Sequence, residues 1–108
     1  MKKREIVRDN RKFNNIIATG SVLKNKYFVL YYNKVSEDDL KFGIAVGKKV
    51  GNAVTRNRYK RKIRSIVDNN KLLFQKGYNY IIIVKKESLS LDHQALNDNL
   101  VQLIEKVK

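Results

Sequence analysis

The sequence contains no cysteine, no proline and no tryptophan in 108 residues. Without cysteine the chain can form neither disulfide bonds nor metal sites with thiolate ligands, which is compatible with the reducing cytosol. No internal repeat, low-complexity tract or flexible linker divides the sequence. A chain of this length forms one hydrophobic core, so residues 1–108 are predicted to fold as a single domain.

Long apolar segments are also missing. The first residues, MKKREIVRDNRKF, do not lead into the apolar stretch of a signal peptide, and the longest apolar runs, at residues 27–32 and 80–84, are far shorter than a membrane span. No second membrane signal, such as a lipid attachment site, accompanies the basic residues. We therefore expect a cytoplasmic protein with no membrane partner.

Patterns typical of catalytic sites are not found either. The chain has no Ser/His/Asp set, no glycine-rich phosphate loop followed by Lys-Ser/Thr, and no spacing typical of metal ligands. Its single histidine, His93, lies near the start of the last predicted helix, where a surface or capping role is commoner than catalysis. The sequence therefore predicts no catalytic residue, no metal bound by the protein alone and no small-molecule substrate.

Acidic residues are scarce and basic residues are abundant. The chain has 24 Lys or Arg and 10 Asp or Glu, which gives a net charge of +14. Residues 1–64 carry +13 of this charge, and residues 65–108 carry only +1. The partner is therefore expected to be an anion that meets the first part of the chain, and nucleic acid is the commonest such partner.

The first predicted element is a short amphipathic helix. Either Asp9 or Asn10 can cap its start, and Gly20 suits a left-handed residue at its end. Its apolar face is formed at i, i+3 and i+4 spacing by Phe13, Ile16 and Ile17.

Two strands are predicted next, at residues 27–32 (YFVLYY) and 42–46, with a polar turn at residues 36–39 between them. Two antiparallel strands fit this order best. Alternation in the first strand places Phe28, Leu30 and Tyr32 on one face, which we expect in part to be core.

A long helix is predicted from Asn52 to about Phe74, with Gly77 as its stop. Residues 78–84 (YNYIIIV) then predict a strand buried on both faces, and a turn at residues 88–90 leads into a last helix. The order α-β-β-α-β-α predicts an α/β sandwich with helices packed on a small mixed sheet. The apolar stripes of the two helices contain Tyr59, Ile63, Ile66, Val67 and Leu73 or Phe74, and Leu96, Leu100, Leu103, Ile104 and Val107.

The long helix opens with a strongly basic segment, GNAVTRNRYKRKIR, at residues 51–64. Nearly the whole arc away from its apolar stripe is cationic, and no acidic residue occurs between Lys41 and Val67. A helix that is merely soluble usually mixes both signs and gains from pairs at i and i+4. Uniform positive charge therefore predicts a nucleic-acid-binding surface, with a solvated helix face as the simpler alternative.

The other face of the first strand carries Tyr27, Val29 and Tyr31. These side chains could be core. Alternatively, the face is open beside the first helix, where aromatic rings edged by basic residues make a stacking platform for single-stranded nucleic acid. The pattern alone leaves both interpretations open.

Residues 48–64, KKVGNAVTRNRYKRKIR, resemble the signature of the protein subunit of bacterial ribonuclease P. The similarity extends through RKFNNIIATG, KYFVLYYN, LKFGIAVGKKVG and YIIIVKK, so it covers nearly the whole chain. The resemblance implies a fold related to that of a ribosomal protein, in which the long helix joins two parallel strands by a left-handed crossover. Most such crossovers are right-handed.

The resemblance also implies a function. Ribonuclease P is a ribonucleoprotein endoribonuclease that removes the 5′ leader from precursor tRNA. Its RNA subunit, with Mg²⁺, hydrolyses the phosphodiester bond, while the protein subunit binds that RNA and the leader. The implied partners are therefore ribonuclease P RNA and precursor tRNA, and Mg²⁺ is expected to be bound mainly by the RNA.

Two groups of site residues are implied by the family motif. Those expected at the RNA subunit are Lys48, Lys49, Asn52, Arg56, Asn57, Arg58, Lys60, Arg61, Lys62 and Arg64. Those expected in a leader-binding cleft between the first helix and the open sheet face are Phe13, Ile17, Val29 and Tyr31. Ile17 stands where many members of the family have a second phenylalanine, so apolar contact is expected there in place of stacking.

Three other functions fit parts of the pattern. A ribosomal protein would share the size, charge and fold but would not depend on precursor tRNA. A small DNA-architectural protein would bind duplex DNA at least as well as structured RNA. A free-standing protein nuclease would need acidic or histidine side chains to activate water, and the sequence offers no evident set of them.

Overall fold

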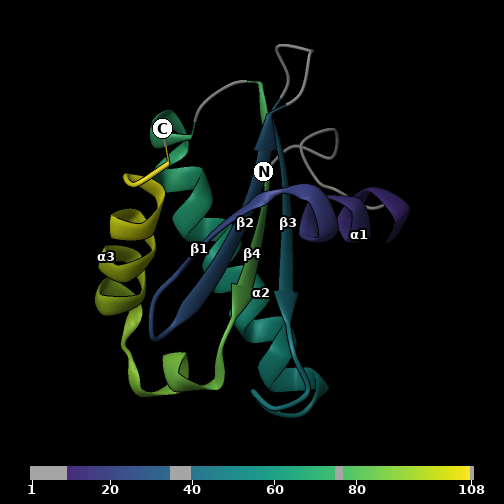
Figure 1. Ribbon diagram of the computed structural model, residues 1–108. Coiled ribbons are helices and arrows are strands. Elements are labelled where there is room, and N and C mark those ends of the chain that lie inside the picture. The colour runs from purple at the N-terminus through teal and green to yellow at the C-terminus, as the bar shows by residue number, and fades with distance from the viewer. Residues whose placement is uncertain (1–9, 35–39, 75–76, 108) are drawn as a thin grey trace.

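The computed structural model describes residues 10–34, 40–74 and 77–107 (Figure 1). Helices and strands follow one another in the order α1 (Asn10–Thr19), β1 (Ser21–Lys24), β2 (Phe28–Lys34), β3 (Leu40–Val46), α2 (Ala53–Asn69), η2 (Lys71–Leu73), β4 (Tyr78–Val84), η3 (Lys86–Ser90) and α3 (His93–Ile104), where η denotes a 3-10 helix. The mixed α/β class agrees with the prediction.

The sheet has four strands in the order β1-β2-β4-β3. β4 pairs antiparallel with β2 and parallel with β3, so it lies in the interior of the sheet. Ile81 and Ile82, which point to opposite faces, are both fully buried, as the apolar run predicted. β2 and β3 run in opposite directions, as expected, but they do not pair with each other, because β4 lies between them and pairs with both.

The crossover connection from β3 through α2 to β4 has an uncommon handedness (Figure 1). In this view both strands point downward, α2 returns behind the sheet, and β4 lies to the left of β3. This path is a left-handed crossover, as the resemblance implied, whereas the great majority of such connections are right-handed.

The larger core lies between the sheet and the helices α2 and α3. α2 contributes the predicted stripe of Tyr59, Ile63, Ile66 and Val67, all of them buried. The sheet contributes aromatic rings: Phe42 and Tyr80 lie 5.9 Å apart, and the ring of Phe74 meets both nearly edge-on at 4.7 and 5.0 Å. These contacts hold α2 on the sheet by its apolar side, so its basic side is left at the surface.

A second, smaller cluster lies between the sheet and α1, which crosses the opposite face near one end of the strands (Figure 1). We call this side of the sheet the α1 face. Ile16 and Ile81 are buried at its centre, and Phe13, Ile17, Tyr31 and Ile83 pack around them while remaining partly exposed. The predicted apolar spacing of α1 is therefore confirmed. Asp9, one of its two candidate caps, lies outside the described residues.

The end of α1 differs from the prediction. Gly20 is not among the residues with a positive φ. Instead its backbone N–H donates to the carbonyl oxygen of Ile16 at 2.8 Å, and a β-carbon at this position would lie 2.5 Å from that oxygen and 2.8 Å from the carbonyl oxygen of Tyr32. Glycine is needed here because two backbone segments approach closely.

Strand β1 was not predicted. It has four residues, of which only Leu23 is partly buried, so it shows no alternation of apolar and polar side chains. The turn that joins it to β2 is built by Asn25, whose side-chain oxygen accepts hydrogen bonds from the backbone N–H groups of Tyr27 and Phe28. Tyr27 therefore lies in the turn and packs against the α2 and α3 core, which corrects its expected place beside Val29 and Tyr31.

α2 ends at Asn69, about five residues earlier than predicted. The side chain of Asn70 donates to the carbonyl oxygen of Ile66 and to the side-chain oxygen of Asn97, both at 2.8 Å, and so closes the helix against α3. Gly77, with φ of 82°, does not stop the helix but forms the turn into β4. The predicted turn at residues 36–39 lies outside the described residues.

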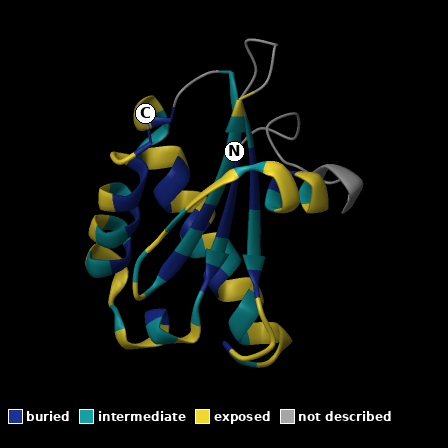
Figure 2. Ribbon diagram, viewed as in Figure 1, coloured by how far each residue is buried: buried dark blue, intermediate teal, exposed yellow. Residues whose placement is uncertain are grey.

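The remaining predictions for the last third of the chain hold. The turn expected at residues 88–90 is part of η3, and α3 begins at the cap Asp92, whose side chain accepts from the N–H of Ala95. All the expected apolar residues of the last helix are buried (Figure 2). In the segments that the structure describes, no helix has the length and apolar character needed to cross a membrane.

Gly20→Ala should lower the free energy of unfolding by about 1 to 3 kcal/mol, because a new β-carbon would collide with two backbone oxygens that cannot turn aside. Urea unfolding followed by circular dichroism measures this loss. Gly47→Ala is the matched control, since only its chain neighbours lie within 4 Å of the added carbon and stability should be unchanged or rise by up to about 1 kcal/mol. Equal losses in the two variants would contradict the explanation.

Candidate nucleic-acid interface

The basic segment starts as a capped helix. Asn52 is the N-cap of α2: its side-chain oxygen accepts a hydrogen bond from the N–H of Thr55 at 3.0 Å, and its carbonyl oxygen accepts from the N–H of Arg56 at 2.9 Å. Just before it, the N–H of Val50 donates to the carbonyl of Gly47, and this turn carries Lys48 and Lys49 at the surface. Asn52, predicted to bind RNA, therefore also has a structural role.

Four of the predicted residues line one open hollow of about 450 Å³ on the exposed side of α2. They follow the helical spacing i, i+3, i+4 and i+7, so their side chains share one strip of the helix surface. We call this strip the basic arc, and it consists of Asn57, Lys60, Arg61 and Arg64.

The other predicted residues on α2 lie beside the basic arc and differ in exposure. Arg58 is exposed. Lys62 extends over the ring of the buried Tyr59, with its Nζ 5.0 Å from the ring centre. Arg56 is partly buried, and its Nε lies in the interior without a hydrogen-bond partner. Lys62 and Arg56 therefore use part of their side chains for packing.

The charge on α2 is placed against the preference of the helix itself. Its six Lys or Arg residues fall within residues 56–64, and no acidic residue stands in its first turn. The N-terminal end of a helix carries a partial positive charge, so cations near it are unfavourable and anions are favoured. Within the helix the like charges also repel one another. A bound polyanion would relieve both costs.

The structure brings together three of the four residues predicted for the leader-binding cleft. Phe13 and Ile17 on α1 and Tyr31 on β2 belong to the same apolar cluster. Val29 lies on the same face of the sheet, paired with Ile83, but it is not a member of that cluster. All four side chains are partly exposed, so this face of the sheet is only partly covered by α1.

Gly43 is a further residue of the α1 face that the sequence analysis missed. A β-carbon at Gly43 would lie 2.9 Å from Cε2 of Phe13 and 2.6 Å from Cδ1 of Ile81. The ring of Phe13 therefore lies directly on bare backbone of β3. A glycine in the interior of a predicted strand is a recognised sign of such a close approach, and it could have been used here.

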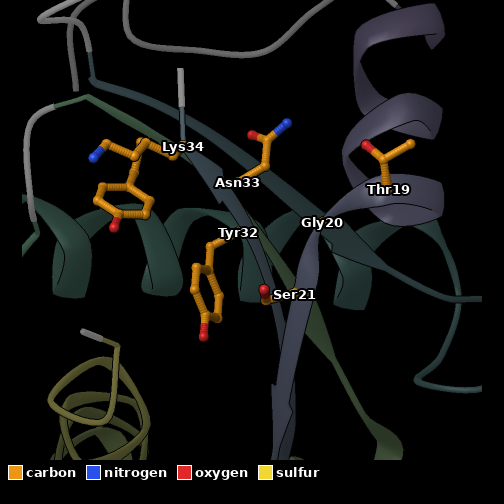
Figure 3. Close-up of a pocket in the computed structure, with 7 residues that line it drawn as sticks. Thr19, Gly20, Ser21, Tyr32, Asn33 and Lys34 are labelled. Atoms are coloured by element: carbon orange, nitrogen blue, oxygen red, sulfur yellow. The ribbon is translucent and has the colours of Figure 1, made fainter. Parts of the chain in front are cut away.

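A polar hollow of about 510 Å³ lies where α1 leads into β1, away from the predicted site residues (Figure 3). Thr19, Gly20 and Ser21 form one side, and Tyr32 and Lys34 of β2 contribute to the other. Figure 3 shows Tyr32 and Asn33 pointing to opposite sides of the strand, as alternation requires.

Together, the fold and these surfaces define a small, strongly basic α/β protein in which one helix and the turn before it carry a dense cluster of positive charge, the features expected of a nucleic-acid-binding protein. A model of the ribonuclease P family matches residues 1–108. The chain therefore belongs to the ribonuclease P protein family, and its role is in tRNA processing.

Similar proteins of the family span the full chain. The ribonuclease P protein component of Mycoplasma capricolum subsp. capricolum is 40% identical over 109 residues, which cover 100% of both chains. The RNase P protein from Thermotoga maritima has a TM-score of 0.88 at 32% identity, covering 97% of this chain and 99% of that one. The RNase P protein of Staphylococcus aureus has a TM-score of 0.89 at 28% identity, covering 98% of this chain and 97% of that one.

Asn52→Ala should lower the free energy of unfolding by about 0.5 to 2 kcal/mol, because it removes the side-chain oxygen that caps α2. Asn52→Asp keeps an oxygen acceptor at the same place and should retain the stability of the unmodified protein. Asn57→Ala is the control, since this exposed helical position should gain slightly from the better helix former. Urea unfolding compares the three variants, and equal stability of the two Asn→Ala variants would refute the capping role.

Proposed function

We propose that the chain is the protein subunit of a ribonuclease P holoenzyme, in which it binds the RNA subunit and the 5′ leader of precursor tRNA. The observation that carries the proposal is the exposed basic arc on α2, in a segment without a single acidic residue. A ribosomal protein would share such a surface. The match to the ribonuclease P family over residues 1–108 favours tRNA processing instead.

The RNA subunit docks on α2 and on the turn before it. Phosphate groups neutralise the like charges of the basic arc, and guanidinium groups such as those of Arg61 and Arg64 can bind them through two parallel hydrogen bonds. Lys48 and Lys49 extend the same surface beyond the start of the helix. Since the side-chain oxygen of Asn52 caps α2, its amide N–H groups remain as the donors that can meet RNA.

The leader lies on the α1 face. Phe13 and Tyr31 are partly exposed rings on two different elements, so a single strand between α1 and the sheet can stack bases on them. Ile17 and Val29 add apolar contact to the flat faces of bases. Stacking of this kind depends little on base identity, which suits a protein that serves many precursor tRNAs.

Phosphodiester hydrolysis is assigned to the RNA subunit. The side chains of the basic arc are guanidinium, ammonium and amide groups, which bind phosphates but are poor general bases near neutral pH. Among the residues that the structure describes, His, Cys, Asp and Glu nowhere form a group of three that could hold a metal ion. The guanidinium, ammonium and amide groups of the basic arc are not ligands for Mg²⁺, so we assign the ion to RNA phosphate oxygens.

The unmodified protein, added to ribonuclease P RNA, should restore 5′ cleavage of precursor tRNA at low Mg²⁺ concentration. The double variant Arg61→Gln with Arg64→Gln should need a higher protein concentration for the same rate. Filter binding across a salt series should show a shallower dependence of affinity on salt, because each lost phosphate contact removes about 0.9 from the slope on duplex-like RNA.

Lys106→Gln is the control for these two substitutions. Lys106 is exposed after the end of α3, and its replacement removes one positive charge outside α2. It should leave the salt slope nearly unchanged. If the unmodified protein restores no cleavage, the proposed function is wrong. If the protein restores cleavage but the α2 variant behaves like the control, RNA docks elsewhere on the chain.

Phe13→Ala combined with Tyr31→Ala should weaken binding of precursor tRNA to the holoenzyme and leave binding of mature tRNA nearly unchanged. Each stacked base is worth about 1 to 3 kcal/mol, so the loss should reach at least tenfold in affinity. Equilibrium binding of both substrates measures the difference. Equal losses on both would mean that removing the rings damages the fold, and no loss on either would mean that the leader lies elsewhere.

Ile17→Phe provides the converse test, because it adds a third ring to the partly exposed cluster that contains Phe13 and Tyr31. Leader binding should become tighter if this surface is open to a strand. In a closed apolar cluster the larger side chain would instead cost about 1 to 3 kcal/mol of stability. Thermal unfolding of the free protein, measured beside the binding of precursor tRNA, separates the two results.

A further inference from the structure

The helix α1 is attached to the sheet by little buried surface. Of its side chains from Phe13 to Thr19, only that of Ile16 is buried, with 1% of it exposed. A helix of ten residues also has little stability of its own. The position of α1 therefore depends on its contacts with the sheet, and two of these contacts are made at glycines.

Gly20 and Gly43 let the two halves of α1 lie against bare backbone. At the C-terminal end, a β-carbon on Gly20 would lie 2.8 Å from the carbonyl oxygen of Tyr32. In the N-terminal half, a β-carbon on Gly43 would lie 2.9 Å from Cε2 and 3.2 Å from Cδ2 of Phe13. Carbon atoms in contact prefer a separation of about 3.5 to 4.0 Å. A side chain at Gly43 would therefore push the ring of Phe13 away from the sheet.

Gly43 lies in the same row of the sheet as the second ring of the leader site. Ile81 of β4 pairs with Gly43 of β3 on one side and with Tyr31 of β2 on the other. Neighbouring strands are about 4.8 Å apart, so the backbones at Gly43 and Tyr31 are separated by roughly 10 Å. Ile81 lies between them and is fully buried. The ring of Phe13 and the ring of Tyr31 thus belong to opposite ends of one row.

The two rings are held by different parts of the fold. Tyr31 belongs to β2, which pairs with β1 and β4, so the sheet fixes the position of its backbone. Phe13 belongs to α1, and the distance of its ring from the sheet is set where it meets Gly43. A side chain at Gly43 would shift one ring and leave the other in place. Binding sites require their contact groups to stay within about 0.5 Å of the productive geometry.

We propose that Gly43 is a positioning residue for the leader site, because the absence of a side chain places the ring of Phe13 at the depth at which Phe13 and Tyr31 stack on the same strand. This inference rests on the proposed function. Gly43 is itself buried, so it acts on the leader only through Phe13. A glycine needed for packing alone would affect stability, whereas a positioning glycine also affects leader binding, and only while the ring of Phe13 is present.

Gly43→Ala introduces the single carbon atom that tests this role. The nearest neighbour of that carbon would be Cδ1 of Ile81 at 2.6 Å, and the next two are the ring atoms of Phe13. Ile81→Val removes Cδ1 and leaves only a small cavity. The Ile81→Val protein is therefore used as the parent of every variant, so that the ring of Phe13 is the principal obstacle to the added carbon and the loss of stability is reduced.

The experiment measures the affinity of the reconstituted holoenzyme for precursor tRNA and for mature tRNA. Gly43→Ala should weaken binding of precursor tRNA about fivefold, which corresponds to the smallest contribution of one stacked base, and should leave binding of mature tRNA unchanged. In a chain that also carries Phe13→Ala, Gly43→Ala should cause no further loss, because the ring that it displaces is absent. This double-mutant cycle separates an effect through Phe13 from a general loss of stability.

A second measurement follows the stacking itself. Precursor tRNAs carry 2-aminopurine at successive leader positions, and this base loses fluorescence when it stacks. At a holoenzyme concentration that binds all the precursor tRNA, Gly43→Ala should raise the fluorescence at the stacked position toward the value for Phe13→Ala. Reduced stability alone would not change this signal, because every precursor tRNA remains bound to folded protein.

A loss of affinity that is confined to precursor tRNA and disappears in the Phe13→Ala chain would support the proposal. Equal losses on precursor and mature tRNA would overturn it, and so would a loss that persists undiminished without the ring of Phe13. It would also be overturned if Gly43→Ala changed nothing while Phe13→Ala with Tyr31→Ala still weakened leader binding, and the proposed function would then stand. If neither variant altered leader binding, the leader site and the role of Gly43 would both be refuted.

Discussion

The parallel pairing of β3 with β4 is the contact on which the rest of the molecule depends. Parallel neighbours cannot be joined by a tight turn, so the chain between them has to return across one face of the sheet, and here it does so as α2. The same pairing brings the ends of the two strands to one edge. The turn before α2 and the start of η3 meet there, and their lysines surround a single hollow.

The direction in which α2 presents its charge follows from this crossing. Tyr59, Ile63 and Val67 bury one side of α2 against the sheet. The basic arc, on the opposite side of the helix, therefore faces outward. The apolar contacts therefore have to overcome repulsion between like charges as well as the loss of chain entropy. An isolated helix of this length and composition would have little stability of its own, because cations lie near its N-terminal end, where anions are preferred. Packing, not helix propensity, holds the charges in place.

The elements whose apolar residues recur at regular spacing, or form one continuous run, could be predicted from the sequence. α2 and α3 have continuous apolar stripes, and the run from Tyr80 to Val84 fits only a strand covered on both sides. β1 could not be predicted, since an edge strand with a single inward side chain has no pattern. The end of α2 was also missed, because Asn70 stops it through a hydrogen bond to Asn97, a residue of another helix.

In the candidate site, too, some features could be predicted from the sequence and others depend on tertiary contacts. A run of basic residues on one helix is visible in the sequence, and the family motif identifies it. The hollow where β3 and β4 end is not visible, because the two chain segments on its rim are separated by α2, η2 and β4 and meet only through the parallel pairing. Nor does the sequence show that Asn52, Arg56 and Lys62 serve the fold as well, since capping and packing depend on neighbours in space. Local patterns predict which residue types are present, whereas tertiary contacts decide what each can still bind.

The chemistry of the α1 face limits how a bound strand could be recognised. Base identity is read through hydrogen bonds to base edges, and RNA-binding proteins that are specific for sequence splay bases out to reach them. Phe13, Ile17 and Val29 offer only carbon atoms, Tyr31 adds a single hydroxyl group, and Ile83 continues the same apolar surface. Such a surface distinguishes an unpaired strand from a duplex, because only an unpaired strand can place its bases flat against rings. Under the proposed function, the protein therefore recognises chiefly that the leader is single-stranded.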